Sequence, residues 1–125
     1  MTARALVAAC LLLAAGCASG TSLRAYGEGW SATLSWTPRR PVALQPVVLR
    51  LRLTGPADAP LEVLELQAEA GMPEMDHGVE AVEFRRMAPG VYEARHVFSM
   101  DGRWVIRIRG KAGRPDASFV VHVGR

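Results

Sequence analysis

The side chains best suited to chemistry in this sequence gather in ten residues, GMPEMDHGVE, at positions 71–80. Met72, Met75 and His77 follow one another at a Met-x-x-Met-x-His spacing. Thioether sulfur is a soft, uncharged ligand that binds Cu(I) well, and imidazole nitrogen also suits copper. Pro73 stiffens the segment, and a glycine on each side lets the chain turn sharply. These residues predict a short loop with three donors for a Cu(I) ion.

Two further donors stand outside this loop. Met100 lies in the turn sequence SMDG, and His96 precedes it by four residues, near the end of an expected strand. We predict that Met72, Met75, His77 and Met100 bind the metal, whereas His96 is either a fifth ligand or a buried, hydrogen-bonded histidine. The competing interpretation is that the methionines fill irregular gaps at the end of the core, which is a common use of this residue.

Other chemistries fit the sequence poorly. Asp76 and His77 are adjacent, but no serine stands in a strand-turn-helix context that would make it a nucleophile. Glu74 and Asp76 are two loop carboxylates, fewer than a calcium site needs. No glycine-rich phosphate loop leads into a helix. We therefore expect a protein that is not an enzyme.

The charge of the chain does not indicate a nucleic-acid partner. The formal net charge is only +3. The arginines at 50, 52, 103, 107 and 109 alternate with apolar residues along expected strands, which is typical of solvated sheet faces. Aromatic residues do not interleave with them as a base-stacking surface would require.

The N-terminal segment reads as an export signal. A basic Arg4 precedes an apolar run that is too short to span a bilayer comfortably. The ending LLLAAGC resembles a bacterial lipoprotein signal, which implies a lipid on Cys17; the alternative is a plain secretory signal cut near Ala18 or Gly20. We predict a signal peptide over 1–16, a flexible tether over 17–29 and one domain over 30–125. With Cys10 in the signal and Cys17 blocked by lipid, a soft metal in the domain must use thioether or imidazole ligands.

Throughout the domain, apolar residues recur at every second position, which is the period of a β-strand. Apolar residues alternate with polar ones in seven segments separated by turn sequences, which predicts strands over 30–36, 47–54, 64–70, 79–87, 91–98, 103–109 and 118–123. In the same pattern His122 points outward, and Met87 lies in the core or at its rim. Seven short strands with turns every 8–12 residues predict an all-β fold, a single immunoglobulin-like antiparallel β-sandwich.

Three short motifs together resemble the YtkA-like domain, which has FixH-like relatives. They are MPEMDHG, PGVYEA and FSMDGRW, within a resemblance that runs from about Ala43 to Val123. The resemblance implies a small immunoglobulin-like sandwich, secreted as a lipoprotein or anchored to a membrane, and an association with copper handling. It places the ligands at Met72, Met75, His77 and Met100. The second His-x-Met pair of oxidase-assembly copper chaperones is missing here, because Val123 and Gly124 follow the last histidine.

We therefore expect a lipid-anchored Cu(I)-binding protein of the cell envelope that faces the periplasm and stores or transfers copper. Its expected partners are the membrane, reached through the lipid anchor, and a copper-receiving or respiratory membrane protein. Ala18 after the cysteine favours the outer membrane, because the aspartate that retains some lipoproteins at the inner membrane is missing. The alternative is a non-catalytic interaction module that binds no metal and docks on a membrane complex through the same loop.

Overall fold

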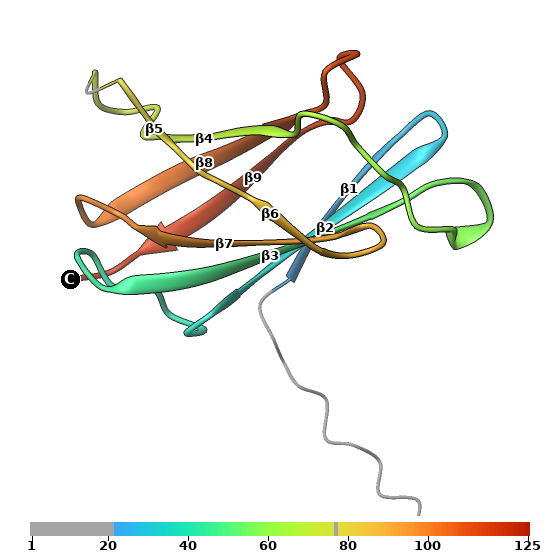
Figure 1. Ribbon diagram of the computed structural model, residues 1–125. Helices are drawn as coiled ribbons and strands as arrows, with labels where there is room; N and C mark the ends of the chain where they lie inside the picture. Colours follow the sequence, from blue (N-terminus) through green and yellow to red (C-terminus); the bar gives the residue numbers. More distant parts are fainter. Residues whose placement is uncertain (1–21, 77) are drawn as a thin grey trace, which may run out of the picture.

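The computed structural model describes residues 22–76 and 78–125 as two antiparallel sheets packed face to face (Figure 1). One sheet has the strand order β1-β2-β3-β7-β6 and the other has the order β5-β4-β8-β9. The predicted all-β sandwich is therefore confirmed. No helix in this part of the chain is both long enough and apolar enough to cross a membrane. The elements are β1 (Ser22–Gly27), β2 (Trp30–Thr37), β3 (Pro46–Thr54), the 3-10 turn η1 (Pro56–Asp58), β4 (Gln67–Gly71), β5 (Val79–Ala81), β6 (Arg85–Ala88), β7 (Val91–Val97), β8 (Gly102–Arg109) and β9 (Asp116–Val123).

The hydrophobic alternation sets which face of each strand is buried. In β3, Leu49, Leu51 and Leu53 are fully buried, whereas Arg50 and Arg52 between them are exposed. Full burial of one such leucine stabilises the fold by about 1.5–3 kcal/mol. The second sheet obeys the same rule, and its inward residues include Trp104, Ile106, Ile108, Phe119 and Val121. The core is thus a layer of alternate residues from both sheets, as in other sandwiches.

The first described strand corrects the predicted tether. Residues 22–27 form β1, which pairs with β2 along its whole length. Leu23 and Ala25 are partly buried against the core, while Arg24 between them is exposed. The period of two therefore begins eight residues earlier than the predicted domain start at 30. Glycine and polar residues around this strand concealed it, since such composition is also typical of linkers.

Two other predicted strands are shorter or divided. The strand predicted over 64–70 begins only at Gln67, because Glu65 adopts a left-handed backbone conformation (φ 53°) and leaves Leu64 82% exposed. The strand predicted over 79–87 is two strands, β5 and β6, which belong to different sheets. Between them the buried Val82 donates its backbone N–H to the Ala68 carbonyl at 3.0 Å as the chain crosses between the sheets. Crossings of this kind form the corners of sandwiches.

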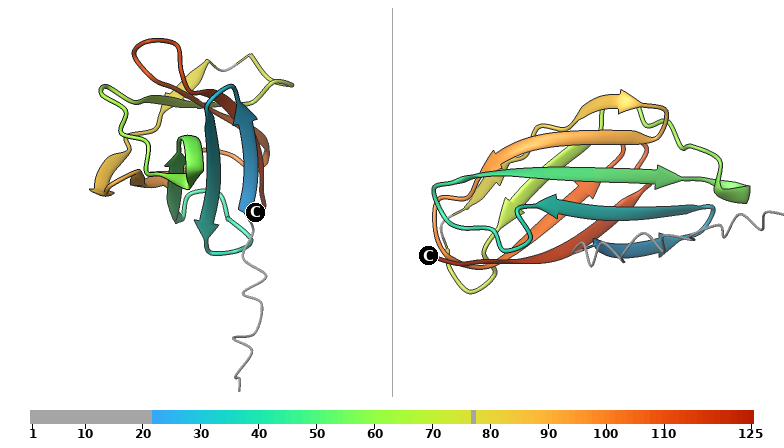
Figure 2. Two further views of the ribbon diagram at one scale, coloured as in Figure 1. Left: turned by 90° about the vertical axis from the view of Figure 1, so that its right-hand side faces the viewer. Right: turned by 90° about the horizontal axis from the view of Figure 1, so that it is seen from below.

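One end of the sandwich collects the segments that carry the candidate ligands. The β4–β5 loop, the β7–β8 turn, the β2–β3 connection and the C-terminus all lie at the left end in Figure 1, and Figure 2 shows them from two further sides. The Leu44 N–H donates to the Phe98 carbonyl at 2.8 Å, which joins the β2–β3 connection to the end of β7. The two methionine-bearing turns therefore share an end of the molecule.

Candidate metal centre

The methionine loop begins where β4 ends. Ala70 and Met72 share the inward side of the strand, and Met72 is buried in the core cluster. The Met75 N–H donates to the Met72 carbonyl at 3.1 Å, which closes a tight turn over Pro73 and Glu74. This turn leaves the Met75 side chain 39% exposed. The loop thus holds one buried and one exposed thioether three residues apart.

The β7–β8 turn lies against this loop. Gly102 has a positive φ of 137°, and a Cβ at this position would collide with the terminal methyl group of Met72. The positive φ favours glycine here, and the Met72 methyl group occupies the space that a side chain would take. Arg103 Nη1 donates to Glu74 Oε1 at 3.0 Å, and both side chains are exposed, so this pair is a weak surface contact.

The structure brings three of the four predicted ligands to one end of the sandwich. Met72 and Met75 border a shallow hollow of about 320 Å³ together with Pro73. Met100 is partly buried against the core, and its carbonyl accepts the Trp104 indole N–H at 3.0 Å. It stands two residues before Gly102, the residue that Met72 touches. The predicted ligand His77 and the predicted lipidation residue Cys17 lie outside the described residues.

His96 is held by a carboxylate behind the methionine loop. Its ring is 9% exposed, and Nε2 lies 2.8 Å from Glu80 Oε2. The edge of the ring packs on Phe98 with a centroid separation of 4.8 Å and an interplanar angle of 76°. His96 therefore occupies the position of a buried, hydrogen-bonded histidine, with Nε2 engaged by a carboxylate. His122, by contrast, is exposed on β9.

Glu80 is the residue of this region that sequence reasoning missed. Its Oε1 accepts hydrogen bonds from the Ser99 N–H at 3.3 Å and from the Ser99 hydroxyl, while its Oε2 meets His96. Glu80 lies on β5, directly after the methionine loop, and Ser99 directly precedes Met100. This carboxylate therefore ties the two methionine-bearing segments together across the sheets. The sequence does contain an indication of this role. Glu80 stands two residues before the buried Val82, so the period of two places both side chains on the inward face.

The donor chemistry at this end is soft. Within residues 22–76 and 78–125, no three or more His, Cys, Asp or Glu side chains gather as a group that could hold a metal ion. The thioethers of Met72, Met75 and Met100 are the soft donors described near the loop, and the Asp76 carboxylate also borders the hollow. Thioethers bind Cu(I) well and hard cations poorly, so the donor set fits a Cu(I) ion.

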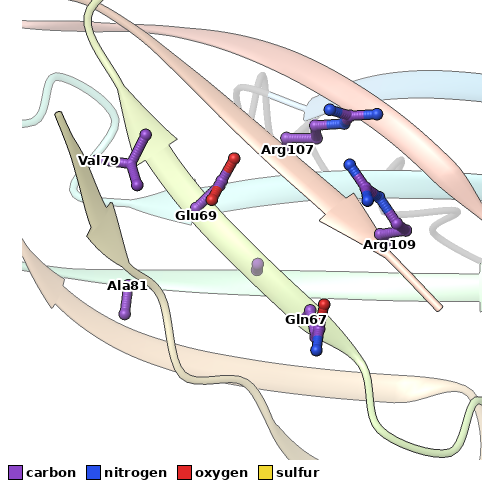
Figure 3. A pocket seen from close by; sticks show the side chains of 7 residues that line it. Gln67, Glu69, Val79, Ala81, Arg107 and Arg109 are labelled. Atoms are coloured by element: carbon purple, nitrogen blue, oxygen red, sulfur yellow. The ribbon is translucent and has the colours of Figure 1, made fainter. Parts of the chain in front are cut away.

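A second hollow adjoins the first on the outer face of the four-stranded sheet. Figure 3 shows it between Val79 and Ala81 on β5 and Arg107 and Arg109 on β8, with Glu69 of β4 between them. Arg107 is hydrogen-bonded to Asp116 at 2.9 and 3.1 Å, and this bond lowers the pKa of the Asp116 carboxyl group. The exposed Val79 borders both hollows, so the hollow of the methionine loop continues into this second hollow. The second hollow has apolar residues on its β5 side and arginines on its β8 side.

Comparisons with known proteins assign the family. The chain is similar to a solved structure titled "Crystal structure of the Lin-41 filamin domain", with a TM-score of 0.49 and 15% sequence identity over 82% of this chain and 93% of that one. No curated protein gives a significant match. The model of the YtkA-like family matches residues 25–109, a span that includes the methionine loop, the Glu80–His96 pair and the β7–β8 turn. This chain belongs to the YtkA-like family.

Proposed function

We propose that this protein binds Cu(I) through Met72, Met75, Met100 and His77, and that it stores or transfers copper at the cell envelope. The observation that carries the proposal is the joining of the methionine loop to the β7–β8 turn. The Met72 methyl group lies against Gly102, and Glu80 bonds the residue before Met100. Thioethers from two turns of the chain are thereby held at one end of a rigid sandwich.

The loop combines a fixed donor with an accessible one. Met72 is buried and packed, whereas the exposed Met75 meets solvent beside it. Met75 is therefore the thioether that an ion can reach from solvent, whereas packing holds Met72 in place. His77 adds an imidazole from the same loop. Because imidazole binds metal only when neutral and thioethers do not titrate, affinity falls only partly in acid.

The cellular setting of the proposal follows from the N-terminal sequence. A lipid on Cys17 holds the domain at a membrane on its periplasmic side, with the outer membrane favoured. The proposed role is non-catalytic: copper storage, copper transfer or accessory work in oxidase assembly, with a copper-receiving or respiratory membrane protein as partner. An exposed thioether such as Met75 suits transfer, because an incoming ligand can reach the ion from solvent.

A second candidate function is a metal-free interaction module. The observation that favours it is the exposure of two apolar neighbours, Met75 at 39% and Val79 at 62%, beside the hollow of the methionine loop. Methionine is an adaptable residue at promiscuous contact surfaces. In this role the loop contacts a membrane complex directly, and copper does not alter the contact.

A competition titration separates the two functions. The purified protein is titrated under anaerobic, reducing conditions against a chromogenic Cu(I) chelator at neutral pH. We expect it to withdraw one Cu(I) per chain, and to leave a Zn²⁺ indicator unchanged because thioether donors favour the softer ion. Failure to withdraw Cu(I) from even a weak chelator would exclude the copper function and leave the interaction module.

A further inference from the structure

A groove lies on the side of the sandwich where the described chain begins. Its apolar floor is formed by Leu23 at the start of β1, Trp36 at the end of β2, Val42 after it, and Val120 and Val123 on β9. It encloses about 820 Å³, which is within the range of ligand-sized sites. We call this feature, together with its charged rim, the basic groove.

The rim of the basic groove is cationic. It carries Arg39, Arg40 and Arg125, with His122 beside them, and none of the described residues that line the groove is an aspartate or a glutamate. One of the arginines is paired: Asp101 Oδ2 lies 3.4 Å from Arg125 Nε, and this arginine is 92% exposed. Such a pair contributes little and leaves most of the guanidinium open to a partner.

The fold itself gathers these charges from distant parts of the chain. The Gly124 N–H donates to the Pro41 carbonyl at 2.8 Å, and the Ala43 N–H donates to the Gly124 carbonyl at 2.8 Å. These bonds fix Arg40 next to Pro41 and Arg125 next to Gly124 at one edge, although 85 positions separate the two arginines in the sequence (125 − 40). Like charges held together repel one another, so an anionic partner stabilises the arrangement.

The position of the chain entry identifies which anionic partner fits. Ser22 begins β1 at this groove, and Cys17 lies five residues upstream, a distance of about 17 Å at full extension. A lipid on Cys17 therefore holds the groove within reach of the headgroups. The attraction of a basic cluster to an anionic leaflet acts within a Debye length, about 8 Å at physiological salt.

We propose that the basic groove docks the domain on a bilayer surface rich in anionic phospholipid headgroups. The arginines contact the headgroup phosphates, and the apolar floor faces the interfacial region. The groove shares one end of the sandwich with the β7–β8 turn, because Arg125 at its rim pairs with Asp101 in that turn (Figure 1). The inference uses the proposed lipid on Cys17 but does not depend on copper.

Hydrogen–deuterium exchange of the full-length chain on lipid nanodiscs tests the proposal. The chain is placed on nanodiscs of phosphatidylcholine alone or with about one third phosphatidylglycerol, without copper in the buffer. We expect amides of segments 39–45 and 120–125 to exchange about fivefold or more slowly on the anionic discs. The reason is that one arginine at an anionic surface strengthens membrane binding by about 1 kcal/mol, which is a factor of roughly five. Salt of about 0.5 M should remove the difference.

Matched charge reversals identify the surface. Arg40→Glu with Arg125→Glu should abolish the slowing, whereas Arg52→Glu with Arg109→Glu, an equal change of charge on the outer sheet faces, should retain it. Equal exchange on both discs, or slowing that survives the first pair, would overturn the proposal. Mass spectrometry of the same sample reports the lipid on Cys17 separately, and the copper titration is independent, so failure of either is distinguishable from failure of the groove.

Discussion

Replacing Met72, Met75 and Met100 together by leucine is expected to weaken Cu(I) binding by at least about a hundredfold. Loss of hydrogen-bonding partners around metal ligands alone costs 10–100-fold in affinity, and this variant removes three proposed ligands directly. Leucine conserves the volume of methionine, so each exchange should cost less than about 1.5 kcal/mol of folding stability. The competition titration measures the affinity, and thermal unfolding monitors the fold.

Met87→Leu is the matched control for this variant. Met87 lies on the edge strand β6, exposed and away from the loop, so its replacement should leave the affinity unchanged. Among single variants, Met75→Leu tests the exposed donor with the least disturbance of the core. A triple variant that binds Cu(I) as tightly as the wild type would contradict the assigned ligands.

Glu80→Ala is expected to destabilise the fold by about 2–4 kcal/mol. The substitution removes a hydrogen-bonded carboxylate and leaves the buried His96 ring and the Ser99 N–H without that partner. It also releases the turn that carries Met100, so Cu(I) affinity should fall about tenfold, as for other residues that orient metal ligands. Urea unfolding and the competition titration measure the two effects in one preparation.

Two controls separate the role of Glu80 from a general loss of charge. Glu83→Ala removes a nearby exposed carboxylate and should change the unfolding free energy by less than about 0.5 kcal/mol. Glu80→Ala combined with His96→Phe replaces both partners by apolar groups, which should recover part of the lost stability. A loss of stability equal in Glu80→Ala and Glu83→Ala would contradict the proposed tie between the sheets.

The fold was predictable where alternation is strong and uninterrupted. The segments 47–54 and 103–109 carry apolar residues at every second position, so one register alone buries them. Residues 22–27 were missed because glycine and small polar residues dilute the same period. The division of 79–87 was also missed, because a crossing between sheets depends on tertiary packing around Val82 that no local pattern reports.

The candidate site was predictable in its donors but not in its support. Soft ligands and their spacing are visible in the sequence at Met72 and Met75. The connection between their loop and the β7–β8 turn depends on the hydrogen bonds of Glu80 with His96 and Ser99. These partners are 16 and 19 residues away in the sequence. Such long-range pairing is set by the registers of both sheets, and a single sequence does not specify them together.

Copper K-edge X-ray absorption of the Cu(I)-loaded protein tests the central claim most directly. If thioethers of the methionine loop and the β7–β8 turn hold the ion, the wild-type spectrum contains sulfur neighbours. Those neighbours disappear in the variant with Met72, Met75 and Met100 replaced by leucine. A wild-type spectrum with nitrogen and oxygen neighbours alone, or sulfur neighbours that persist in the triple variant, would contradict the account.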